Sequence, residues 1–200
     1  MVRPRADNYE ERKQEIADAA AAVFAEQGFD GSSISFVAQR CGVSKALLYH
    51  YFQSKEDLLY YMLKSHCQLL VECATSALRT SANPEKQLRS LIRELMQLYM
   101  NARDKHAVLL NNLKSLPENQ QDEIRELEKR VVQSIKKLVG KLRPDLSEQM
   151  RTATAMYLMG AINFTYVWFK PQGPISARQY ADLATSIFLE GIQRNGSGVR

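Results

Sequence analysis

The chain has few of the residues that interrupt regular structure and few that cross-link it. Its 200 residues include 9 glycines, 6 prolines and 3 cysteines. Collagen-like and disordered chains need far more glycine or proline, and 45% hydrophobic with 24% charged residues is ordinary for a soluble globular protein. An odd number of cysteines without metal-ligand spacing excludes a disulfide framework, so we expect reduced, mostly buried thiols.

Long apolar runs are also absent. No run approaches the roughly 20 residues of a membrane span, and residues 1–5 lack the apolar core of a signal peptide. We therefore expect a cytoplasmic protein without a membrane partner. The net charge of +5 favours a polyanionic partner only weakly, because many inert proteins carry as much.

The sequence has no sustained alternation of apolar and polar residues, the pattern typical of β-strands, and its apolar residues instead recur at helical spacing. Apolar residues at i, i+3, i+4, i+7 and i+8 predict a first helix over residues 8–27, which Gly28 ends. Ser33, Ser44 and Ser54 are expected to cap the next three helices, and prolines separate the later helical segments. The sequence predicts an all-α chain of about nine helices, one of them over about 144–169.

Residues 33–52 have the organisation of a helix-turn-helix. Gly42 permits the tight turn, Ser44 caps the second short helix, and Leu48 and Phe52 lie on its inward face at i and i+4. The outward positions are then Lys45, Ala46, Leu47, Tyr49, His50 and Tyr51. Small, polar and basic residues on the first turns of such a helix are typical of one that enters the major groove of DNA.

Acidic residues are missing from this part of the chain. Residues 31–55 contain three basic residues and no aspartate or glutamate, whereas residues 1–30 contain seven acids. The free amides at the serine-capped helix N-termini also suit phosphate oxygens. The distribution of charge therefore supports binding to double-stranded DNA better than the total does.

The stretch FAEQGFDGSSISFVAQRCGVSKALLYHYFQSKEDLL, residues 24–59, resembles the N-terminal domain of TetR-family transcriptional regulators, which joins GVS, LYxYF and SKExLL in this order. Ser33, Phe36 and Ala46 depart from the usual family residues, so the resemblance does not predict the operator sequence. The resemblance implies a DNA-binding domain over 1–54 and an effector-binding and dimerisation domain over 55–200. It assigns phosphate contacts to Ser33, Ser44, Tyr49 and Lys55, and base or near-base contacts to Lys45, Ala46, Leu47 and His50.

Several of these residues have a plainer interpretation. Phe52 is expected in the core, while Tyr49 is expected to function on the outward face. Lys55 is an ordinary solvated lysine unless the motif gives it a role. His66 and Cys73 share a helix face but lie about 10 Å apart along the axis, too far for one metal ion. A buried, satisfied histidine is then the first expectation for His66, and a pocket role the second.

The last two predicted helices carry an apolar pattern that we expect to form a homodimer interface, with packing inside the chain as the alternative for part of it. The predicted interface residues are Ala153, Gly160, Ala161, Phe164, Ala184, Ile187, Phe188 and Gly191. The segment INFTYVWFKPQGPISARQYADLATSIFLEGI is weakly similar to the C-terminal hairpin of family members that sense acyl-CoA thioesters.

A small-molecule effector is expected in a mostly apolar pocket, although core packing is the plainer interpretation of any single residue. The predicted lining is Met62, His66, Met96, Tyr99, Leu109, Leu113, Tyr157 and Asn163. We expect no metal and no cofactor, and the lack of catalytic motifs makes an enzyme improbable. The favoured hypothesis is a nucleoid-associated, dimeric repressor released from a palindromic operator by an apolar or acyl-type ligand. The alternative is an effector-independent nucleoid protein.

Overall fold

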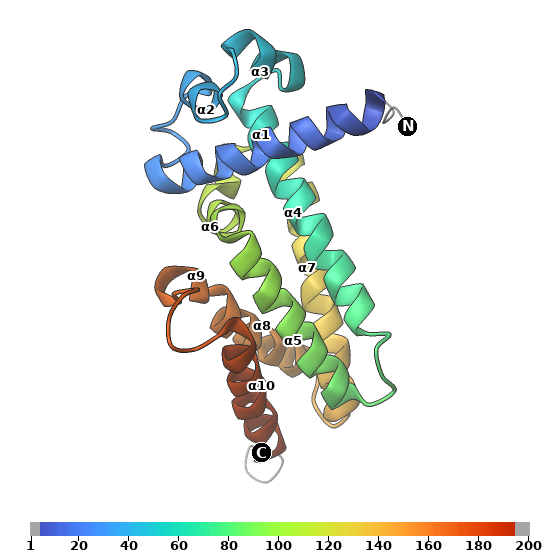
Figure 1. Cartoon of the computed structure of the whole chain (residues 1–200). Coiled ribbons are helices and arrows are strands. Elements are labelled where there is room, and N and C mark those ends of the chain that lie inside the picture. The colour runs from blue at the N-terminus through green and yellow to red at the C-terminus, as the bar shows by residue number, and fades with distance from the viewer. Residues whose placement is uncertain (1–4, 195–200) are drawn as a thin grey trace. The chain divides into compact units, whose positions relative to one another are not determined.

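The computed structural model describes residues 5–194, and its regular structure in this range is entirely helical (Figure 1). The prediction of an all-α chain is confirmed. The helices are α1 (Arg5–Gln27), α2 (Ile34–Arg40), α3 (Lys45–Tyr51), α4 (Lys55–Ala77), α5 (Pro84–Asn101), α6 (Arg103–Asn112), the 3-10 turn η1 (Leu113–Ser115), α7 (Glu118–Leu142), α8 (Glu148–Asn163), α9 (Thr165–Trp168) and α10 (Ala177–Arg194).

One predicted helix is divided in the structure. The helix expected over about 144–169 becomes α8 and the four-residue α9, with a break at Phe164. The Thr165 hydroxyl donates to the Ile162 carbonyl at 2.6 Å, a side-chain bond that competes with continuation of the backbone ladder.

Two glycines end helices as the sequence predicts. Gly28 follows α1 with φ of 76°, and Gly42 lies between α2 and α3 with φ of 64°. Side chains with a Cβ rarely adopt this left-handed conformation. Within residues 5–194, no residue other than glycine has a positive φ.

The chain forms two compact units. The first comprises the N-terminal residues up to Cys67 together with Asp104–Arg125, and the second comprises Gln68–Arg103 and the residues from Glu126 onward. The expected domain boundary after residue 54 thus falls inside the first unit. The reason lies in the core, because Leu58 and Leu59 at the start of α4 are completely buried.

Polar contacts tie the helices of the first unit together. Lys105 of α6 forms an ion pair with Asp18 of α1. Glu123 of α7 accepts hydrogen bonds from the Tyr60 hydroxyl at 2.5 Å and from Lys64 of α4 at 2.9 Å. These bonds hold the pKa of the Glu123 carboxyl below its ordinary value. The helix-turn-helix is therefore built on α1, α4, α6 and the start of α7.

In the second unit, α10 packs most extensively against α5 and also contacts α8. The Arg93 guanidinium of α5 donates to the Asp182 carboxylate of α10, and Arg89 of α5 donates to the Ser186 hydroxyl at 3.1 Å. The hydrogen bond from Arg93 holds the pKa of Asp182 below its ordinary value. Apolar burial and polar side-chain contacts thus fix α10 on α5.

The three cysteines are free thiols, as expected. Cys67 is buried, whereas Cys41 and Cys73 are half-buried, so burial is less complete than predicted. Among the helices described, none is both long enough and apolar enough to cross a membrane.

Candidate nucleic-acid interface

The two short helices begin at the serines that the sequence predicts. The Ser33 hydroxyl accepts the Phe36 N–H at 3.2 Å, and the Ser44 hydroxyl accepts the Leu47 N–H at 3.0 Å. A serine oxygen that accepts one bond still carries its own O–H donor. Both hydroxyls remain available to donate to a phosphate.

The predicted inward face of α3 is confirmed, and the predicted outward face is confirmed except at Tyr51. Leu48 is completely buried and Phe52, just after the helix, is almost so, whereas the predicted contact residues on α3 are exposed. The exposed residues are Lys45, Ala46, Leu47, Tyr49 and His50. The Lys45 ammonium lies 5.8 Å from the centre of the Tyr49 ring, so a cation and a phenol share this surface.

The other two basic residues of the acid-free stretch have partners within the protein. Arg40 forms an ion pair with Glu26 of α1 at 3.3 Å. Lys55 donates to the carbonyls of Phe29 at 2.7 Å and Ser32 at 3.1 Å, and its ammonium lies 4.2 Å from the centre of the Phe29 ring. The structure thus gives Lys55 a bonding role inside the first unit, which the expectation of a phosphate contact did not include.

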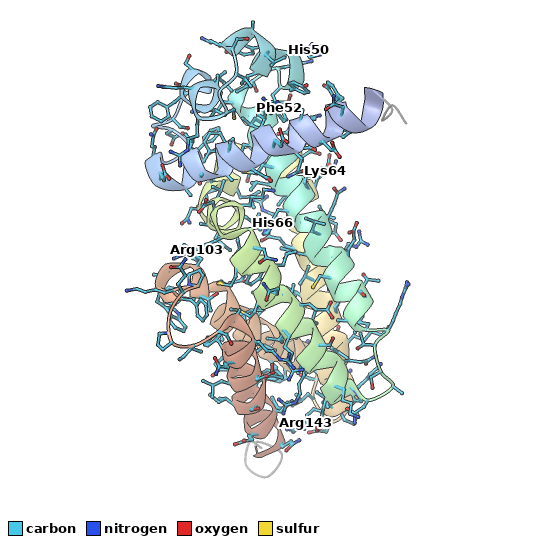
Figure 2. All side chains as sticks on the ribbon, viewed as in Figure 1. His50, Phe52, Lys64, His66, Arg103 and Arg143 are labelled. Carbon is cyan, nitrogen blue, oxygen red and sulfur yellow. The ribbon has the colours of Figure 1, made fainter. Side chains whose placement is uncertain are left out.

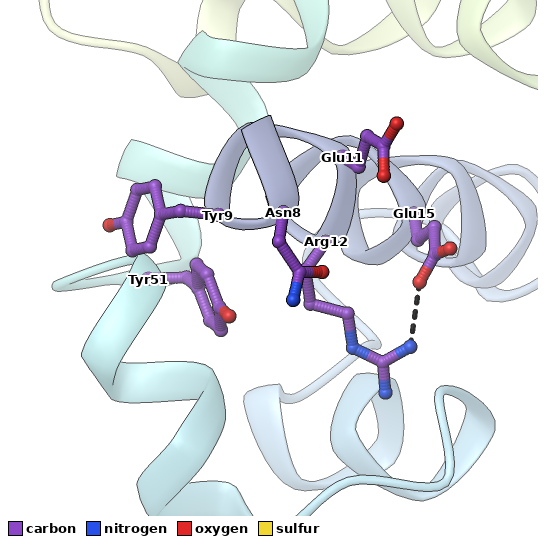
Figure 3. A pocket seen from close by; sticks show the side chains of 6 residues that line it. All are labelled: Asn8, Tyr9, Glu11, Arg12, Glu15 and Tyr51. Atoms are coloured by element: carbon purple, nitrogen blue, oxygen red, sulfur yellow. Dashed lines mark hydrogen bonds and ion pairs between the residues drawn. The ribbon is translucent and has the colours of Figure 1, made fainter. Parts of the chain in front are cut away.

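A groove beside α3 was missed by the sequence analysis. It has a volume of about 520 Å³ and is lined by Asn8, Tyr9, Glu11, Arg12 and Glu15 of α1 and by Tyr51 of α3 (Figure 3). The centres of the two tyrosine rings lie 4.8 Å apart, and Arg12 forms an ion pair with Glu15 at 2.6 Å (Figure 3). Tyr51 was expected on the outward face, and its packing on Tyr9 makes it half-buried.

Four of the predicted pocket residues lie in the first unit. Met62, His66 and Leu109 are buried, whereas Leu113 is half-buried. The Nε2 atom of His66 lies 3.3 Å from the Nδ1 atom of His106. The satisfied histidine expected from the sequence is therefore only half satisfied, because Nδ1 of His66 is buried without a hydrogen-bond partner.

The other four predicted pocket residues lie in the second unit. Met96 and Tyr99 are buried, and the Tyr99 hydroxyl donates to the Asn163 side chain at 2.9 Å. Tyr157 is 68% exposed on α8, which corrects its placement in an interior pocket. It lies instead on the same helix face as Gly160 and Phe164, at i+3 and i+7.

The predicted dimer residues divide into exposed and buried members. Ala153, Gly160, Phe164, Ile187 and Gly191 are exposed, and Ala161 and Ala184 are half-buried.

Phe188 is 3% exposed, which corrects its assignment to the interface, because it lies on the buried face of α10 with Ala181 and Thr185. Leu183, which was not predicted, is 52% exposed one turn before Ile187.

Two family models match most of the chain. Residues 16–62 match the model described as bacterial regulatory proteins, tetR family, and residues 81–192 match the tetracyclin repressor-like C-terminal domain. The chain belongs to the TetR family. The first match covers the helix-turn-helix, and the second covers more than half of the sequence.

Relatives extend the match over nearly the whole length. A TetR-family transcriptional regulator from Bordetella parapertussis has a TM-score of 0.86 at 33% identity, over 91% of this chain and 96% of that one. The transcriptional repressor KstR2 of Mycobacterium tuberculosis is 26% identical, over 92% of this chain and 94% of its own. AibR, solved with isovaleryl coenzyme A and operator DNA, has a TM-score of 0.78 at 25% identity, over 88% of this chain and 97% of its own. The protein is a transcriptional regulator of the TetR family.

Proposed function

We propose that this TetR-family regulator is a homodimeric repressor that binds a palindromic operator and is released by an apolar or acyl-type small molecule. The observation that carries the proposal is the exposed face of α3. Lys45, Tyr49 and His50 are exposed there, while Leu48 anchors the helix in the core. A rigid helix with exposed donors on its first turns is suited to reading base edges in the major groove.

The contacts proposed from the sequence follow this geometry. The Ser33 and Ser44 hydroxyls and the Tyr49 phenol would donate to phosphates, while Lys45 and His50 would lie nearest the bases. Ala46 and Leu47 would make apolar contacts with base edges or thymine methyl groups. The groove at α1 adds Tyr9 and Asn8, whose hydroxyl and amide are suited to the sugar-phosphate backbone.

Exposed apolar residues on α8 and α10 support the dimer. Tyr157, Phe164, Leu183 and Ile187 are each more than half exposed, which is unusual for so many large apolar side chains on two adjoining helices. A Cβ added at Gly160 would meet nothing within 4 Å, so this position leaves room for a partner helix to approach. Two-fold symmetry would then present two copies of α3 to the two halves of a palindrome.

The effector class is inferred from relatives and from buried apolar side chains of the first unit. AibR was solved with isovaleryl coenzyme A, and the names of other relatives refer to fatty acid metabolism and to ketosteroids. Isovaleryl groups, fatty acids and steroids share an apolar carbon skeleton. In the first unit of this chain, Met62 and Leu109 are buried apolar side chains.

Sequencing genomic DNA fragments captured by the purified protein tests the proposal. We expect palindromic fragments, bound in competition with a large excess of unrelated DNA and released by acyl-CoA thioesters in a mobility-shift assay. Capture without sequence preference would instead support the effector-independent nucleoid protein. If the protein captures palindromes but no acyl compound releases it from them, the role as a sequence-specific regulator stands and the acyl effector class is refuted.

A further inference from the structure

Two histidines meet in the interior of the first unit. His66 lies midway along α4 (Figure 2), and His106 lies on α6. The rings meet edge to face with centres 5.5 Å apart, and Nε2 of His66 lies 3.3 Å from Nδ1 of His106. Both side chains are buried, His66 completely and His106 to within 2%. Position and distance establish a hydrogen bond between the two rings.

The pair is neutral at physiological pH. Burial, followed by the positive charge of Lys105, lowers the pKa of His66 to about 4. Burial, followed by the neighbouring His66, lowers the pKa of His106 to about 3. Each neutral ring carries one proton, so one nitrogen of the shared bond donates and the other accepts.

The remaining nitrogen of His66 has no partner. Nδ1 is buried and makes no hydrogen bond within residues 5–194. Its neighbours on the same face of α4, Met62, Leu63 and Leu70, are buried apolar side chains. Because an unsatisfied buried polar atom destabilises a protein, such an atom in an apolar setting indicates a missing partner.

A metal ion does not fit this position. Within the described part of the chain, no group of three or more histidine, cysteine, aspartate or glutamate side chains is placed to hold one. Lys105, which lowers the pKa of His66 by its charge, would also repel a cation.

We propose that Nδ1 of His66 is the hydrogen-bonding anchor for an uncharged polar group, a carbonyl or a hydroxyl, on the apolar part of a small molecule. The proposal rests on the proposed effector function and names the group that the site recognises. For a carbonyl, Nδ1–H of His66 donates outward and Nδ1–H of His106 donates to Nε2 of His66. For a hydroxyl donor, Nε2–H of His66 donates to His106 and Nδ1 accepts. Either arrangement keeps one proton on each ring, so the site adapts without becoming charged.

Two substitutions at His66 distinguish the roles of its two ring nitrogens. The amide of glutamine reaches the position of Nε2 and so preserves the bond to His106, whereas the amide of asparagine reaches only the position of Nδ1. The probes are isovaleryl coenzyme A and its S-isopentyl thioether, which has the same carbon chain without the carbonyl oxygen. Operator affinity without probe, measured on a captured fragment, serves as the control for folding.

The wild-type protein is expected to bind the thioester about tenfold more tightly than the thioether, the size of one buried hydrogen bond. His66→Asn should keep this preference and His66→Gln should lose it, with operator affinity unchanged in both. Nitrogen-15 spectra of the wild-type ring should change at Nδ1 when the thioester is added and not when the thioether is.

If wild type and His66→Gln prefer the thioester over the thioether equally, the role of His66 Nδ1 as an anchor is refuted and the proposed function still stands. Binding of neither probe refutes the acyl effector class and the anchor together.

Discussion

Replacing Lys55 by alanine distinguishes a structural role from a DNA contact. Its ammonium donates to the Phe29 and Ser32 carbonyls at 2.7 and 3.1 Å and lies 4.2 Å from the Phe29 ring centre. These contacts join the first residue of α4 to the loop between α1 and α2. One side chain at the start of α4 therefore bonds to this loop at two carbonyls.

The size of the effect follows from these contacts. A hydrogen bond from a charged donor contributes about 1.5 to 3 kcal/mol, and a cation over an aromatic face about 0.5 to 1 kcal/mol at an exposed site. Phe29 O keeps the Ser32 hydroxyl as a donor at 2.7 Å, which offsets part of the loss. Because Lys55 is half-buried and the contacts are not additive, we expect Lys55→Ala to lower the free energy of unfolding by about 2 to 3 kcal/mol.

Urea unfolding and the salt dependence of operator binding together provide the test. If Lys55 acts inside the protein, Lys55→Ala lowers stability and leaves the slope of log K against log salt unchanged. Lys55→Met, which keeps the aliphatic stem over Phe29 and removes the charge, should be nearly as destabilised. A phosphate contact would give the opposite result, with unchanged stability and a slope reduced by about 0.9. That outcome would refute the structural role.

Lys45→Ala should weaken operator binding by about 1 to 3 kcal/mol without changing unfolding, because the side chain is exposed; normal operator affinity would exclude it from the interface. Gly160→Arg should leave the isolated chain folded and make the protein monomeric in sedimentation. The control Gln133→Arg, at an exposed position of α7, should stay dimeric. A dimeric Gly160→Arg variant would exclude the face of α8 with Gly160 from the interface. Between pH 6.5 and about 4 the unfolded chain protonates histidines that stay neutral when folded, so acid destabilises the protein. From pH 7 to 5, His66→Gln should lose about 2 kcal/mol less stability in urea unfolding than wild type, and an equal loss would contradict the neutral, buried His66.

Local signals explain why the helix-turn-helix was predictable. The Ser33 and Ser44 hydroxyls accept hydrogen bonds from amides three residues away. The turn at Gly42 depends only on the positive φ of that glycine. Leu48 and Phe52 follow one face at i and i+4. Each of these features depends on residues within one turn, so the sequence contains all the information that determines them.

Contacts between distant segments were not predictable in this way. Arg40 and Lys55 belong to the acid-free stretch, but their partners, Glu26 and the carbonyls of Phe29 and Ser32, lie 14 to 26 residues away along the chain. His66 is separated from its partner by 40 residues. Nothing in the sequence indicates which distant group a side chain will bind, so the partners of both basic residues were not predicted.

The α10 helix shows where periodicity alone fails and what its failure implies. Ile187 and Phe188 are adjacent and both apolar, yet Ile187 is 57% exposed and Phe188 is 3% exposed. Successive residues point about 100° apart on a helix, so one helix partner cannot cover both. Within the chain, α5 and α8 cover the side with Phe188 and leave Leu183 and Ile187 uncovered. An apolar surface wider than the chain itself can bury is the physical reason to expect a second copy there.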